Sequence, residues 1–169
     1  MSTFRTSTIP DYIDTLLDVL RLGQWPEFPN DASVQVLDGW PATDQLLRRY
    51  VVVDDTNDEN ADTQSWAMLG NGRKDETYTL FVLIGVRVPG LTMPIVRRAV
   101  FDMLGVVEHV VRGIYTPYPN GAPNPTLGVA GVTSAQLRRG PHAQEWTNEG
   151  PRAGITAAIE VTAQLARIT

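Results

Sequence analysis

The densest group of chemically active side chains in this sequence is a run of five carboxylates within nine residues. They are Asp54, Asp55, Asp58, Glu59 and Asp62. Clustered carboxylates supply the hard oxygen ligands that calcium prefers. An EF-hand loop that begins at Asp54 needs glycine at its sixth position and glutamate at its twelfth, but Glu59 and Ser65 stand there. Because the register fails, the sequence predicts a solvated acidic loop or interaction surface and no metal site.

Basic and imidazole side chains are few and scattered. Of the two histidines, His109 is expected at the edge of a helix and not as a base, and His142 is expected in a turn. The basic doublets Arg97-Arg98 and Arg138-Arg139 are too small for a nucleic-acid footprint and are most simply solvated or paired with acids. We retain Arg138 and Arg139, with the five acids, as candidate interaction residues.

Motifs of the common enzyme classes are absent from the sequence. It has no Gly-x-Ser-x-Gly elbow, no Gly-x-x-x-x-Gly-Lys-Ser/Thr phosphate loop and no His-Glu-x-x-His. The carboxylate pair Asp54 and Asp55 lies in a polar stretch, without the apolar surroundings that acid catalysis by a carboxyl group requires. The chain contains no cysteine, which excludes disulfides, thiolate catalysis and cysteine zinc sites. We therefore expect no catalytic residue and no cofactor.

Length and charge indicate a single soluble domain. The 169 residues suffice to bury a core without disulfides, and we expect one domain over residues 1–169. A net charge of −5 argues against general affinity for nucleic acid or anionic membranes, because both depend on Lys and Arg. No apolar run reaches the length of a signal peptide or a membrane span. We expect a soluble protein made in a cytoplasm.

The elements that must position these side chains are organised around one long strand, Glu76–Val88. Every second residue of it is apolar: Tyr78, Leu80, Val82, Ile84, Val86 and Val88. This period of two predicts a central strand with one covered face, so Leu80 and Ile84 are expected to face helices. The other face carries Phe81 and Leu83, which indicates either packing against another subunit or scattered surface apolar residues.

Two amphipathic helices are predicted, one at residues 10–22 and one that runs to about Arg112. Ser7 or Thr8 can cap the first helix, and Thr92 can cap the second. Two helices can cover only one face of a sheet of this size. The sequence therefore predicts an α+β fold: a two-layer sandwich whose mostly antiparallel or mixed sheet has both helices on one face.

The remaining segments are predicted as strands and loops. Strands are expected at residues 33–37, 49–54, 64–69, 127–137 and 155–165, with a possible short one at 144–147. A hairpin turn at 70–72 leads into the long strand, for which 155–165 is the natural partner. Residues 115–125, which hold four prolines, are predicted as a loop, and 138–150 as a turn region. Both are expected to be contact surfaces.

Several strand and turn segments together carry a recognisable pattern. They are Val34–Asp44, Tyr50–Asp55, Gln64–Gly70 and Arg73–Tyr78. With the preceding short helix, the helix after the long strand and the long C-terminal strand, they resemble the tail terminator (tail-completion) proteins of long-tailed bacteriophages. The resemblance covers nearly the whole chain. Its motifs are strand and turn patterns that related neck proteins share, and none is a catalytic signature.

The resemblance implies a structural virion protein and not an enzyme. Such a subunit forms a homo-oligomeric ring, expected to be a hexamer, on the last ring of the tail tube protein; it ends tail polymerisation and joins the tail to the head-tail connector. Genomic DNA passes through the lumen without specific binding. The expected location is the neck end of the tail, and the host cytoplasm during assembly. An exposed sheet face and acidic residues that repel a phosphate backbone fit these expectations.

Alternative functions remain open from the sequence. One is another neck or head-tail completion protein, a second is a small-molecule or peptide-binding module that uses a pocket between sheet and helices, and a third is an unrecognised enzyme. A convergent polar cluster in a deep pocket favours the binding module, whereas a ring-shaped oligomer favours the terminator. The acidic run could line a channel or could pair with a basic partner on an outer rim.

Overall fold

The computed structural model describes residues 7–28, 33–41, 48–54, 63–66, 74–113, 124 and 126–165. Within them the chain forms two helices and six strands. In chain order these are α1 (Ile9–Arg21), β1 (Val34–Asp38), β2 (Arg49–Asp54), β3 (Thr63–Trp66), β4 (Lys74–Arg87), α2 (Met93–Val111), β5 (Val132–Thr147) and β6 (Gly150–Leu165).

The strands form one sheet in the order β1-β2-β4-β6-β5, with β3 paired to β4 off this path. Along one side of β4, β2 pairs with residues 81–86 and β3 pairs with residues 74–77, while β6 occupies the whole of the other side. Only the β1–β2 pairing is parallel among the described strands. The prediction of a mixed, mostly antiparallel sheet is therefore confirmed.

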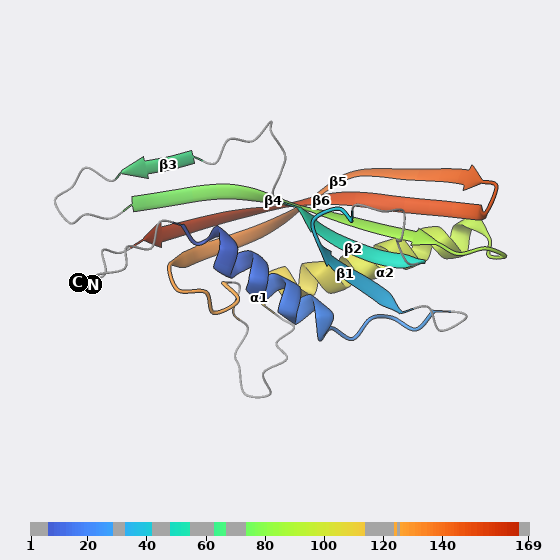
Figure 1. The fold of residues 1–169 in the computed structure, drawn as a ribbon, viewed down its shortest axis with the longest axis horizontal. Helices are drawn as coiled ribbons and strands as arrows, with labels where there is room; N and C mark the ends of the chain where they lie inside the picture. The colour runs from blue at the N-terminus through green and yellow to red at the C-terminus, as the bar shows by residue number, and fades with distance from the viewer. Residues whose placement is uncertain are drawn as a thin grey trace.

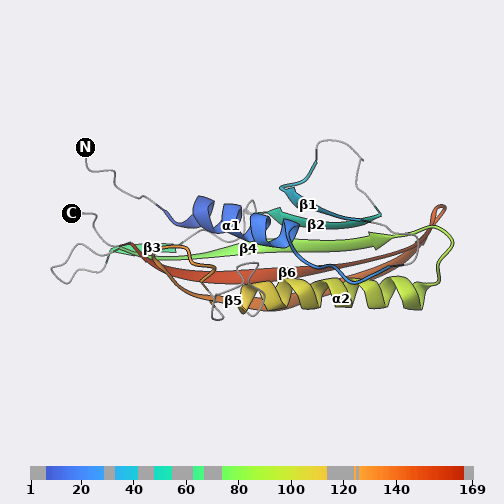
Figure 2. The same cartoon turned by 90° about the horizontal axis from the view of Figure 1, so that it is seen from below.

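Both helices lie on the same face of the sheet (Figure 1). Seen from below, α1 lies over the β1–β2 side and α2 over the β5–β6 side (Figure 2). Their apolar stripes meet the sheet in a single core cluster that includes Leu16, Val100 and Met103 from the helices. The structure thus has the predicted two-layer α+β architecture, in which one sheet face is covered by helices and the other is not.

The long strand alternates as its sequence predicts. Leu80 and Ile84 are each 1% exposed and belong to the helix-covered core, whereas Phe81 and Leu83 on the other face are only half-buried. Complete burial of an aliphatic side chain of this kind contributes roughly 1.5–3 kcal/mol. The predicted pairing with the C-terminal strand is also confirmed, since β4 and β6 are in register from Lys74↔Leu165 to Arg87↔Arg152. These two strands form the centre of the sheet.

The start of α1 is attached to β4 by a buried carboxylate. Thr8 is the N-cap, as predicted, but its side chain makes no capping hydrogen bond to the helix. Instead the Thr8 amide and its hydroxyl both donate to the Glu76 Oε2, each at 2.8 Å. An acidic group at a helix N-terminus interacts favourably with the exposed amides and the helix dipole. Glu76, fully buried, therefore fixes one end of α1 on the sheet.

The prediction for residues 127–150 is wrong in its boundaries. No strand begins at residue 127; β5 begins at Val132 and continues to Thr147, so the predicted turn region is mostly strand and the reversal occurs at 148–149. The strand accommodates Gly140 and Pro141 because a register shift lies between Arg139 and His142. A proline is tolerated at a bulge in an edge strand, where its missing N–H breaks no regular ladder.

Other element boundaries differ slightly from the prediction. The strand β6 begins at Gly150, five residues before the predicted 155, and α1 and α2 each end one residue before the predicted position. The strand β3 ends at Trp66 and pairs with β4 in antiparallel orientation, as a hairpin requires. The predicted turn at 70–72 and the proline-rich residues 115–123 and 125 lie outside the described residues.

Candidate interaction site

Of the five acidic residues predicted as an interaction surface, the structure describes one, Asp54. Asp54 is the last residue of β2, where it is half-buried and opposite Phe81 of β4. The other four predicted acids, Asp55, Asp58, Glu59 and Asp62, lie outside the described residues. Within the described part of the chain, no group of three or more acidic or imidazole side chains is arranged to hold a metal ion.

The basic doublet on β5 is divided between the two faces of the sheet. Arg138 forms an ion pair with Glu160 of β6 at 2.9 Å on the open face. The Arg139 guanidinium lies 5.8 Å from the centroid of the Phe101 ring of α2, on the helix side. Adjacent residues of a strand point to opposite faces, so the two arginines cannot form one basic patch.

Strand pairing brings Asp54 and Arg138 into one row across the open face. Asp54 is opposite Phe81, Phe81 is opposite Ala158, and Ala158 is opposite Arg138. Three strand spacings of about 4.8 Å separate the two charged residues by roughly 14 Å. They therefore share a face without touching, with the half-buried Phe81 between them.

The two histidines have different surroundings. His109 is an exposed residue near the end of α2, as predicted. His142, predicted in a turn, is in β5, where its ring centroid lies 5.6 Å from that of Phe101 and its Nε2 contacts the Gln144 amide. The correction follows from the extension of β5 through the bulge.

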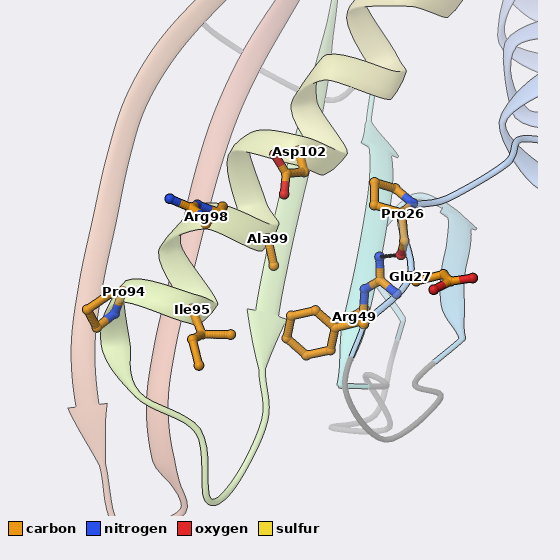
Figure 3. A pocket seen from close by; sticks show the side chains of 9 residues that line it. Pro26, Glu27, Arg49, Pro94, Ile95, Arg98, Ala99 and Asp102 are labelled. Atoms are coloured by element: carbon orange, nitrogen blue, oxygen red, sulfur yellow. Dashed lines mark hydrogen bonds between the residues drawn. The ribbon is translucent and has the colours of Figure 1, made fainter.

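A hollow of about 480 Å³ lies between α2 and the connector that follows α1. We call it the Arg49 slot, because Arg49 of β2 lies at its inner end (Figure 3). One wall is formed by Pro94, Ile95, Ala99 and Asp102 of α2, and the other by Pro26, Glu27 and Phe28. Its volume is within the range of small-ligand pockets.

Arg49 connects the slot to the sheet. Its side chain is only 4% exposed; Nη2 donates to the Pro26 carbonyl at 3.0 Å, and the guanidinium carbon lies 5.0 Å from the Phe28 ring centroid. Burial lowers the pKa of Arg49 below its usual range, because a desolvated cation is disfavoured. The carbonyl and the aromatic ring both stabilise the cation, so Arg49 holds the connector in place.

The α2 wall of the slot combines apolar side chains with one carboxylate. Figure 3 shows Ile95, Ala99 and Asp102 on the side of α2 that faces Arg49, whereas Arg98 points away from it. Ile95 is 41% exposed, although it is a large apolar residue. Within the described chain Asp102 has no ion-pair partner. The slot can therefore accept an apolar group that also carries a hydrogen-bond donor.

A second hollow, of about 320 Å³, lies on the open face beside Tyr50. The Tyr50 ring crosses Gly85, where a Cβ atom would come within 2.1 Å of the Tyr50 Cζ, so only glycine fits. Trp40 packs against Tyr50, and Arg152 donates to its hydroxyl at 3.4 Å. That hydrogen bond, and then the electrostatic interaction with Tyr50, raise the pKa of Arg152; partial burial opposes this rise and Glu145 adds to it.

Exposed apolar side chains mark the surfaces where association is most favourable. Among the described residues the large exposed ones are Leu22 at 66%, Trp40 at 50%, Ile95 at 41% and Trp146 at 70%. Trp146 is near the end of β5, an edge strand of 16 residues that pairs with β6 on one side. An unpaired strand edge of this length offers a row of backbone donors and acceptors to a neighbour.

The comparisons with known proteins give no family for this chain. No protein-family model matches it, and neither does any curated protein sequence. In the described ranges no helix is both long and apolar enough to span a membrane. The interpretation of the site therefore rests on its geometry.

The sequence did not predict the Arg49 slot. Its walls come from three separate segments, and no periodicity links Phe28, Arg49 and Ile95 before the chain folds. Trp146 lies in the possible short strand at 144–147, within a region predicted as a contact surface, but the sequence did not single it out as a contact residue. The sequence feature that could have identified Trp146 as a contact residue is its residue type. A tryptophan near a predicted chain reversal is a large apolar residue at a position where burial is not expected.

Proposed function

We propose that this protein is a tail terminator of a long-tailed bacteriophage: a structural subunit that closes into a ring on the tail tube, stops its growth and joins it to the head connector. The resemblance described above suggests this role. The observation that supports it best is the 16-residue edge strand β5, which accompanies an open sheet face in a chain whose other sheet face carries both helices.

A ring subunit requires surfaces of this kind. Each copy must present one surface to the next copy and a different surface to the copy behind it, because a ring is built from heterologous contacts. The strands at the two ends of the described path β1-β2-β4-β6-β5 are dissimilar, since β1 has 5 residues and β5 has 16. A subunit in this role needs no catalytic group and no cofactor. We propose a hexamer at the neck end of the tail.

The acidic run has a defined role in this proposal. Carboxylates that face the lumen repel the phosphate backbone and let DNA pass, whereas carboxylates on the rim pair with a basic connector protein. Replacing Asp54, Asp55, Asp58, Glu59 and Asp62 by Asn and Gln is expected to preserve folding and to alter DNA passage or docking. Folding is checked by circular dichroism and DNA passage by ejection assays.

The decisive test is genetic. Particles assembled without the protein should carry tails that are too long or that do not join heads, as seen by electron microscopy, and the purified protein should form rings of uniform mass. Tails of normal length, firmly attached to heads, in particles that lack the protein would overturn the proposal.

A second candidate function is a module that binds a peptide or a small molecule. The Arg49 slot favours it, since a hollow of about 480 Å³ with apolar walls, an inward-facing carboxylate and a buried arginine has the features of a ligand site. A protein that stays monomeric at high concentration and binds a ligand in this slot would move this function to first place.

A further inference from the structure

We infer that the Arg49 slot receives the indole of Trp146 from a second copy of this chain, so that copies join head to tail. The inference rests on the proposed function in requiring self-association, and it deepens that function by naming one contact. Two of the four large exposed apolar residues of the described chain take part in this contact: Ile95 lines the slot, and Trp146 is the inserted group.

Trp146 is held in a position suited to insertion. It is 70% exposed, and its strand is closed by a short reversal that Thr147 fixes by donating its hydroxyl to the Gly150 carbonyl at 2.9 Å. Glu149 forms an ion pair with Arg87, and the backbone of the reversal approaches Pro89. A side chain on a rigid support loses little conformational freedom on binding, which favours association.

The slot matches the chemistry of an indole. Its α2 wall is apolar at Ile95 and Ala99, and the Phe28 ring, which packs against Arg49, also lines the slot. An indole is an apolar body with a single N–H donor. The Asp102 carboxylate, which faces the slot and has no ion-pair partner in the described chain, supplies the acceptor for that donor.

Slot and indole lie on opposite sides of α2, so the contact must be between copies. On the β5 side of α2, Arg97 contacts Gln144, which shares a sheet face with Trp146. On the other side lies the slot, which Arg49 of β2 also lines, and β2 is separated from β5 by β4 and β6. The two contacting surfaces differ, which makes the interface heterologous and allows a ring to close.

Two single variants and their mixture test the inference. Trp146→Ala removes the inserted group, and Ile95→Glu places a charge in the slot at a partly exposed position that folding tolerates. Each variant should stay folded by circular dichroism and associate at least about 30-fold more weakly in analytical ultracentrifugation, because a central tryptophan of an interface is a typical hot spot. Trp40→Ala, a change at an exposed tryptophan on the other face, is the control and should assemble like the parent.

The mixture gives the sharpest result. Trp146→Ala keeps a working slot and Ile95→Glu keeps a working indole, so an equimolar mixture should form a heterodimer of twice the protomer mass and nothing larger. Assembly of Trp146→Ala equal to that of the parent would overturn the inference and leave the ring proposal intact. A parent that stays monomeric at every concentration overturns the inference as well, while the proposed function is then decided separately by the tail phenotype.

Discussion

On one face of β4 the alternate side chains from residue 76 to residue 86 are buried beneath the helices, whereas the opposite face of the same strand leaves Phe81 and Leu83 half-buried. Both faces belong to one stretch of backbone with the same pairing to β2 and β6. The difference is therefore set by side chains alone. Alternate residues of this strand therefore serve two purposes: one set stabilises the domain, and the other set remains available for association.

The largest expected effect comes from charging the covered face. Leu80→Asp buries an unpaired carboxylate and should cost more than about 4 kcal/mol, a large share of the stability of a domain of this size. Little or no soluble, folded protein is expected on expression. The matched change on the open face, Leu83→Asp, should leave a folded protein. Comparable urea midpoints for the two variants would remove the distinction between the faces.

A smaller loss is expected when the polar anchor of α1 is removed. Glu76→Ala removes the acceptor of the buried Thr8 amide and leaves the Thr8 hydroxyl only its longer hydrogen bond to Tyr78, so it should lower the free energy of unfolding by about 2–4 kcal/mol. Glu76→Gln keeps a carbonyl acceptor and should lose less. Urea denaturation measures both variants. Equal losses would indicate that the carboxylate fills space and does not act through these hydrogen bonds.

Alkaline pH should reveal the burial of Tyr12. Burial, and then the neighbouring Tyr78, raise the pKa of the Tyr12 hydroxyl above its usual value of about 10. A raised folded-state pKa gives stability that is complete below about pH 10 and is lost at higher pH, by up to about 1.4 kcal/mol per pH unit. Tyr12→Phe should lack this loss and should differ little from the parent at pH 7, because the hydroxyl has no hydrogen-bond partner in the described chain. The free energy of unfolding of both proteins is measured between about pH 9 and pH 11, which spans the usual tyrosine pKa. An equal decrease in parent and variant would contradict this prediction.

The smallest effect on stability is expected on the open face. Arg138→Ala breaks an ion pair whose partners, Arg138 and Glu160, keep 69% and 38% of their side-chain exposure. Exposed pairs of this kind contribute about 0–1 kcal/mol, so the unfolding midpoint should hardly move. The Arg138→Ala variant is also compared with the parent in assembly or in DNA passage. A large loss of stability would show that the open face also supports the fold.

The sequence predicts the centre of this fold well and its edges poorly. Periodicity identified β4, both helices and the partnership of β4 with β6, because burial on one face imposes a period of two and burial of a helix stripe imposes a period of 3.6. The edge strand β5 was divided wrongly at Gly140 and Pro141. Its residues are mostly exposed, so burial imposes no pattern on them, and the bulge conceals its continuity.

The polar features could not be predicted because they depend on packing between distant segments. Glu76 is 68 residues from Thr8, and its sequence context is that of an ordinary charged residue at the start of a strand. Arg49 adjoins Arg48 and gives no sign that it alone becomes buried beneath Phe28. Such residues are found only when the register of the sheet is known.

The pairing of β4 with β6 also determines when the molecule can fold. Its partners range from Lys74 and Leu165 to Arg87 and Arg152, so the contacts join residues 65 to 91 positions apart, from 152 − 87 and 165 − 74. Contacts of such long range slow the search for the native state. The strand that enters the sheet between β4 and β5, β6, follows the other described strands in chain order, and until it emerges from the ribosome the two helices have no complete sheet to pack against. We therefore expect folding to follow translation of β6, with the local β5–β6 hairpin formed first and then added to β4 as a unit.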